Sequence, residues 1–77
     1  MNKARRKQIE AALELLQQAS EIIAEVGDEE EEAFDNLPES IQESERGEKM
    51  QEYIDTIDEA VGAIDEVKDN LETILEG

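Results

Sequence analysis

Apolar residues recur at alternating steps of three and four along two long stretches of this chain, and this rhythm restricts its fold more than any other feature. In the first stretch the repeat comprises Ile9, Ala12, Leu16, Ala19, Ile23 and Val26, widened by Leu13, Leu15 and Ile22. In the second it comprises Met50, Tyr53, Ile57, Ala60, Ile64, Val67, Leu71 and Ile74, widened by Ile54, Val61 and Leu75. Such steps place side chains on one face of an α-helix. The sequence therefore predicts an all-α fold.

The only proline, Pro38, separates the two stretches. A residue that precedes proline is disfavoured in the α conformation, so the first helix should end just before it. We predict a helix over about 4–36, a connector over about 37–43 and a helix over about 44–76. Together they form one antiparallel hairpin domain over residues 1–77.

Gly27 is a possible end for the first helix, because glycine often follows a helix C-terminus. Ending at Val26 would leave about a third of the second helix without a partner, whereas Ala33 and Leu37 continue the apolar stripe. Two continuous helices would match at roughly 50 Å each. We therefore expect the first helix to run through Gly27, at a cost of about 1 kcal/mol relative to alanine.

Two helices bury only one stripe each, and chains below about 70–80 residues gain little stability from one core. The stripes here are wide, so we expect two hairpins to dimerise into a four-helix bundle that added salt stabilises. The predicted core and dimer contacts are Ile9, Leu13, Leu16, Ile23, Val26, Met50, Tyr53, Ile57, Ile64, Val67, Leu71 and Ile74.

Acidic residues dominate the surface, and the formal charge is −16. Residues 8–77 carry all 23 acids and only three basic residues. Such a surface repels nucleic acid and anionic membranes, so we expect no direct contact with either and a basic protein as partner. The chain has no cysteine and no histidine, and its first residues lack the apolar segment of a signal peptide. These features favour a cytoplasmic, non-enzymatic protein without a metal or cofactor.

An enzymatic alternative rests on acidic residues at helical spacing. In all-α nucleotide pyrophosphohydrolases, carboxylates on facing helices hold magnesium against a phosphate. Glu31, Glu32 and Asp35 could face Glu52 and Asp55 in this way. Acids are so frequent in this chain that chance explains the spacing, and few basic residues lie nearby to bind a triphosphate. The run Asp28–Glu32 lacks the alternating ligands of a calcium loop and is better explained as a solvated face.

The connector is the preferred site for a partner. Pro38 ends a helix, and Ser40 with Glu43 has capping-box spacing, while Ser44 is a second possible N-cap. These local duties leave Gln42, Glu45 and Arg46 unexplained. The predicted partner-binding residues are Asn36, Glu39, Gln42, Glu45 and Arg46.

Three segments resemble a group of small acidic helical proteins of tailed phages and prophages. They are Ala4-Arg5-Arg6-Lys7-Gln8-Ile9, Asn36-Leu37-Pro38-Glu39-Ser40 and Ser44-Glu45-Arg46-Gly47-Glu48. The resemblance extends over nearly the whole length through short motifs. That group has no settled biochemical activity, so the resemblance implies no functional residues. It implies a context, a nonstructural phage protein in the bacterial cytoplasm.

Two classes of function follow from these expectations. The first is an interaction module that docks on a host or phage protein, with mimicry of DNA charge as a special case. The second is a metal-dependent nucleotide hydrolase or a protein that sequesters a small molecule. The lack of histidine and cysteine favours the first class.

Overall fold

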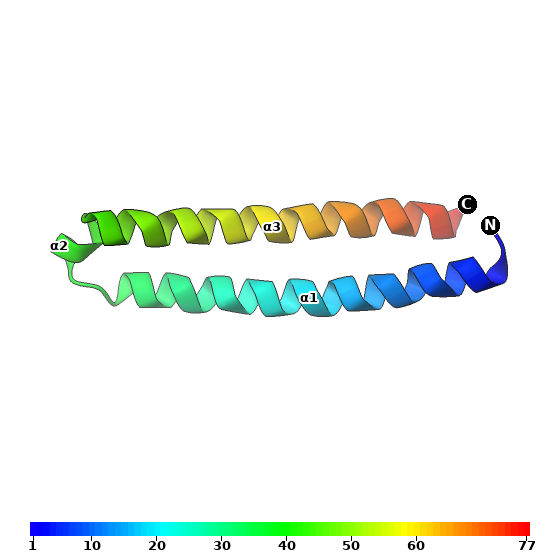
Figure 1. Cartoon of the computed structure of the whole chain (residues 1–77), viewed down its shortest axis with the longest axis horizontal. Coiled ribbons are helices and arrows are strands. Elements are labelled where there is room, and N and C mark those ends of the chain that lie inside the picture. The colour runs from blue at the N-terminus through cyan, green and yellow to red at the C-terminus, as the bar shows by residue number, and fades with distance from the viewer.

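Two long antiparallel helices joined by a short helical connector make up the whole molecule (Figure 1). The computed structural model describes all residues 1–77, with α1 at Lys3–Asp35, α2 at Glu39–Gln42 and α3 at Glu45–Glu76. The hairpin measures 58 × 15 × 13 Å and its radius of gyration is 17.4 Å. A compact domain of this length would have a radius of gyration of about 11 Å. The predicted all-α hairpin is thus confirmed, and it is a rod.

Polar side chains fix the starts of both long helices. The Asn2 side chain accepts a hydrogen bond from the Arg5 amide at 2.8 Å, and Ser44 accepts one from the Gly47 amide at 3.5 Å. Both are N-cap positions, where a side-chain oxygen satisfies a backbone donor that the helix leaves free. The prediction that α1 continues through Gly27 is confirmed.

The contact between α1 and α3 follows a heptad repeat, in which side chains facing the other helix alternate at steps of three and four. We call these residues the seam. On α1 the seam consists of Arg6, Ile9, Leu13, Leu16, Ser20, Ile23, Gly27, Glu30 and Phe34. On α3 it consists of Gly47, Met50, Ile54, Ile57, Val61, Ile64, Lys68, Leu71 and Leu75. All are buried or half-buried.

Four of the residues predicted as core or dimer contacts lie outside the seam, so they are not part of the core of the single hairpin, and their role as dimer contacts stays a prediction. Their side chains are 42% to 54% exposed, and they are Val26, Tyr53, Val67 and Ile74. The predicted stripe and the seam share every second position, so spacing alone could not choose between them. The seam uses Gly27 in place of Val26. A Cβ at Gly27 would lie 2.9 Å from Ile57 Cγ2, so a side chain larger than hydrogen would prevent this close approach of the helices.

The seam forms a thin core. Ile54, at 6% exposure, is the one buried hydrophobic residue, and no side chain is fully buried. The accessible surface is 5769 Å², whereas a compact monomer of this mass would expose about 4,700 Å². Much apolar surface therefore stays in contact with solvent in the single hairpin, including that of Leu15 and Ile22, which are 65% and 64% exposed.

Candidate interaction surfaces

Gln42 holds the connector against the end of α1. Its side-chain amide donates hydrogen bonds to the carbonyl oxygens of Phe34 at 3.0 Å and Leu37 at 3.1 Å, with a longer contact of 3.5 Å to Asp35. A helix leaves its last carbonyl groups without intrahelical partners. Gln42 donates to one of them, that of Phe34, which also accepts from the Leu37 amide, and to the Leu37 carbonyl just beyond the helix. The sequence assigned no local role to Gln42, and this was wrong. Because Gln42 is half-buried and its amide is already hydrogen-bonded, it is less available to a partner than we predicted.

Gly47 is the second residue that shapes the connector, and sequence reasoning did not single it out. A Cβ at Gly47 would lie 2.1 Å from the Gln42 carbonyl oxygen and 2.6 Å from that of Ile41. The first turn of α3 therefore passes directly against the backbone of α2, which only glycine allows. An isolated glycine inside a helical pattern often marks such a close approach, and this was the available signal.

The N-cap of α3 is Ser44, the second of the two serines considered. Its hydroxyl also donates to the Ile41 carbonyl oxygen. Ser40 is exposed and caps nothing, because α2 begins after Pro38 without a side-chain cap. The capping box expected at Ser40 and Glu43 is therefore absent.

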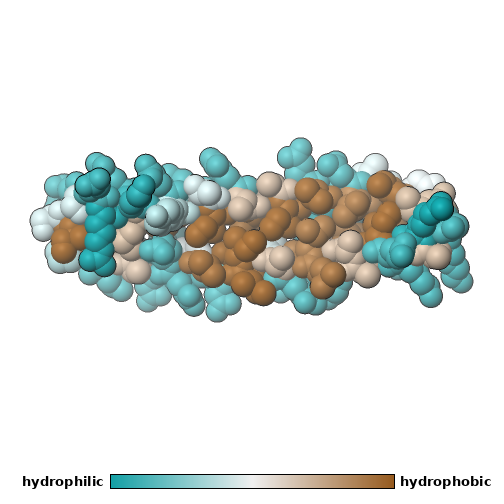
Figure 2. Space-filling model, in the orientation of Figure 1, coloured by the Kyte–Doolittle hydropathy of each residue, from teal (hydrophilic) through white to brown (hydrophobic).

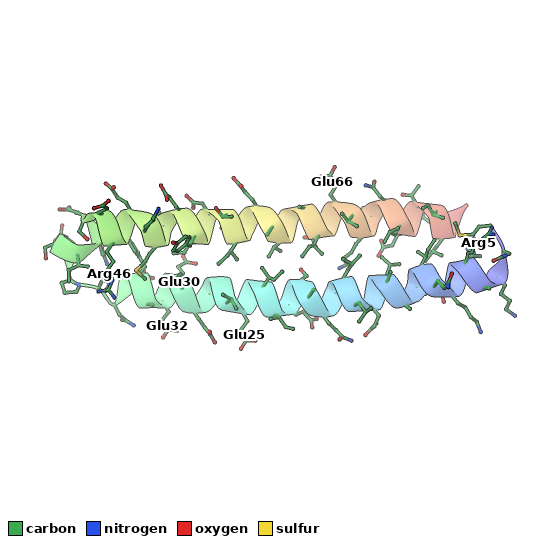
Figure 3. The ribbon with its side chains drawn as sticks, in the orientation of Figure 1. Arg5, Glu25, Glu30, Glu32, Arg46 and Glu66 are labelled. Atoms are coloured by element: carbon green, nitrogen blue, oxygen red, sulfur yellow. The ribbon has the colours of Figure 1, made fainter.

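The other predicted partner-binding residues are exposed at or near the connector, and they are Asn36, Glu39, Glu45 and Arg46. Asn36 is the C-cap of α1, and its backbone amide donates to the Glu32 carbonyl oxygen at 3.1 Å. Arg46 and Arg5 lie near opposite ends of the rod (Figure 3).

Between these two arginines, one long side of the hairpin is almost free of acidic residues. We call it the apolar face; Figure 2 shows it as hydrophobic surface over both helices, with hydrophilic ends. It consists of the heptad positions beside the seam on one side. From α1 these are Arg5, Gln8, Ala12, Leu15, Ala19, Ile22, Val26, Glu29 and Ala33. From α3 they are Arg46, Lys49, Tyr53, Thr56, Ala60, Ala63, Val67, Asn70 and Ile74. Glu29 is its only acid.

The remaining heptad positions carry most of the carboxylates. We call the outer rows of the two helices the acidic edges, and along α3 this row is Glu45, Glu48, Glu52, Asp55, Glu59, Glu66, Asp69 and Glu76. Figure 3 shows Glu25 and Glu32 pointing outward from α1, and Glu66 pointing outward from α3 on the opposite side. Charge is thus segregated around the rod, with acids outward and apolar groups on one side.

The carboxylates considered for magnesium do not come together. Glu32 points away from α3 (Figure 3), and Glu52 lies on the outer row of α3. The structure contains no group of three or more acidic side chains placed to hold a metal ion, and it has no pocket. The motif resemblance to nucleotide pyrophosphohydrolases therefore has no counterpart in the hairpin.

The basic N-terminus lies beside the end of α3. The Arg6 guanidinium donates a hydrogen bond to the Leu75 carbonyl oxygen. A cation is favourable at a helix C-terminus because the last carbonyl groups carry partial negative charge. Arg6 thus has a structural role at the open end of the hairpin.

No family model, curated protein or solved structure matches this chain. Neither long helix contains a stretch apolar enough to cross a membrane.

Proposed function

We propose that this protein is a non-enzymatic interaction module in which two hairpins form a four-helix bundle and the acidic edges dock on a basic protein. The segregation of charge is the observation that carries the proposal. A rod that exposes one apolar face and directs its carboxylates outward has separate surfaces for self-association and for a charged partner. The resemblance to small phage proteins suggests a host or phage protein in the bacterial cytoplasm as that partner.

The acidic edges suit electrostatic docking because their field acts over the length of the molecule. Like charges arranged in this way attract a basic partner from a distance and raise the association rate, in a manner that salt weakens. The exposed connector residues Asn36, Glu39, Glu45 and Arg46 lie at one end of the rod, where they would set the position of the partner.

Affinity capture from bacterial lysate tests this function with three forms of the protein. An edge variant carries Glu52→Gln, Glu59→Gln and Glu66→Gln, and a connector variant carries Pro38→Ala and Arg46→Ala. We expect the wild type to retain a basic protein that raised salt releases, and the edge variant to lose most of it. Equal capture by the wild type and the edge variant would refute docking through the acidic edge of α3. Loss in the connector variant alone would assign recognition to the connector.

Mimicry of DNA is a second candidate, favoured by the regular spacing of the acidic edge on α3. Its carboxylates follow one another mostly at three or four residues, or roughly 5 Å along the helix axis, on a rod 58 Å long. One strand of duplex DNA carries a charge about every 3.4 Å of axis. If the module imitates DNA, competing duplex DNA should displace the captured partner. Capture that ignores DNA would leave the general docking function alone.

A further inference from the structure

The side of the rod that carries the apolar face has the size of a standard protein interface. The apolar face lies on the side of the rod bounded by the two largest dimensions, 58 and 15 Å, and this whole side, charged ends included, has an outline of roughly 800–900 Å². A stable interface of standard size buries about 800 Å² on each partner. Its interior is apolar or small, and the residues that line its centre are Leu15, Ala19, Ile22, Ala60, Ala63 and Val67.

The charges around this face select the kind of partner. Glu29 is the only acid on the face, and basic residues lie at both of its ends. A strongly basic partner would therefore find its counter-charges on the acidic edges and not here. The partner of the apolar face must be apolar along its length and must keep its own carboxylates away, and a second copy of this chain meets both conditions.

We propose that two copies pair through their apolar faces with the connectors at opposite ends of the bundle. This inference deepens the bundle part of the proposed function and does not depend on the basic partner. It specifies the face, the direction and the residues at the centre of the pairing.

The two apolar stretches have nearly the same centre along the rod, so a reversed arrangement keeps them in contact. On α1 the stretch from Ala12 to Val26 is centred on Ala19, and on α3 the stretch from Tyr53 to Ile74 is centred beside Ala63. The close approach of Gly27 to Ile57 and the hydrogen bond from Lys68 to Gln17 fix the register of the hairpin. In that register Ala19 lies at the level of about residue 65, so both centres coincide within roughly one helical turn. A two-fold axis through this level places apolar residues on apolar residues in both helices.

The charged ends of the face favour the same direction. With the copies reversed about Ala19, Arg5 of each copy comes within about one turn, roughly 6 Å along the axis, of the second copy's Glu29. With the connectors at the same end, Arg5 of both copies would lie at the other end of the bundle, far from both Glu29 side chains. The reversed arrangement therefore brings Arg5 of each copy close to the only acid on the second copy's apolar face.

Disulfide trapping tests the arrangement cleanly, because the chain has no cysteine of its own. Ala19→Cys places a thiol at the proposed axis, where two Cα atoms can approach within the about 4.4–6.8 Å that a disulfide requires. We expect most of this variant to form a covalent dimer on mild oxidation. The matched control is Ala11→Cys, which lies on the outer row of α1 and should remain reduced or cross-link only slowly. Equal trapping of the two variants would overturn the proposal.

Two further measurements keep the proposal falsifiable. The native mass of the wild type should be twice 8.7 kDa, and a monomer at high protein concentration would refute the pairing. Spin labels on Ser40→Cys should lie about 50 Å or more apart in the reversed dimer, because each connector is at the far end of a helix of that length. A short distance between the labels, with a dimeric mass, would place the connectors together and overturn the reversed direction. Either failure leaves capture of a basic partner by the acidic edges to be judged on its own.

Discussion

The connector end and the middle of the hairpin differ in how many of their polar and apolar groups find partners within the single chain. At the connector, the Gln42 amide donates to the carbonyl groups of Phe34 and Leu37, Ser44 caps α3, and Gly47 allows α2 and α3 to touch. In the middle, large apolar side chains such as Ile22 and Tyr53 stay exposed beside a thin seam. The groups at the connector find their partners within one chain, whereas the middle leaves large apolar side chains exposed in the single chain.

The connector and the middle therefore play different parts in the fold. The connector determines where the chain reverses, because its hydrogen bonds and its close backbone contact admit one geometry. The middle exposes apolar surface, and this surface contributes to stability in full only if it is buried. Mutations at the connector should therefore act on the fold at any protein concentration, and the stability of the middle should depend on concentration.

Gly47→Ala should produce the largest effect and act on the connector. The added methyl group would meet the Gln42 carbonyl oxygen at 2.1 Å, and a backbone atom cannot move aside by rotating a side chain. We expect a loss of about 3 kcal/mol in the free energy of unfolding, at the upper end of the usual overpacking penalty. Chemical denaturation monitored by circular dichroism measures it. A loss below about 1 kcal/mol would show that the connector adjusts easily, and the contrast between the two regions would fail.

Gln42→Ala should have the next largest effect. It removes the donor to the half-buried Leu37 carbonyl oxygen, whereas the Phe34 oxygen keeps the Leu37 amide as a partner, and we expect a cost of about 1–2 kcal/mol. The matched control is Gln51→Ala, which loses only an exposed contact of 3.3 Å to the Asp55 carboxylate. The control should change stability by less than about 0.5 kcal/mol. Equal effects in the two variants would mean that the Gln42 hydrogen bonds contribute nothing specific.

The sequence predicted the elements well because strong periodicity and the single proline act locally. Pro38 marks a helix boundary through its backbone and Ser44 through its side-chain cap, and both positions agree with the observed bounds. The phase of the seam was not predictable from spacing, since Val26 and Gly27 both continue a three-four repeat. Choosing between them requires knowledge of how closely the helices approach. The role of Gln42 also depends on tertiary structure, because its acceptors lie five to eight residues earlier in the chain.

Protein concentration and salt should then distinguish the middle from the connector. If two copies cover the apolar faces, each tenfold rise in concentration adds about 1.4 kcal/mol to the apparent stability of the dimer. Added salt should stabilise it further, because screening weakens the repulsion between two chains that each carry a charge of −16. Thermal melting over a hundredfold range of concentration, at low and high salt, measures both. A melting temperature that stays constant across that series would contradict a dimer held through the middle.

The smallest change in stability is expected from alanine substitutions at two other glycines, Gly62 and Gly27. A Cβ at Gly62 would meet nothing within 4 Å, so Gly62→Ala should raise stability by about 0.5–1 kcal/mol through helix propensity alone. Gly27→Ala brings the same propensity gain, but its Cβ would lie 2.9 Å from the Ile57 methyl group. Because that methyl group belongs to a side chain, the seam can open slightly, and we expect the gain to be cancelled or reversed. Paired denaturation curves measure the difference between the two variants. An equal gain in both would show that α1 and α3 need no close approach at Gly27, and that the seam follows the apolar residues without help from this glycine.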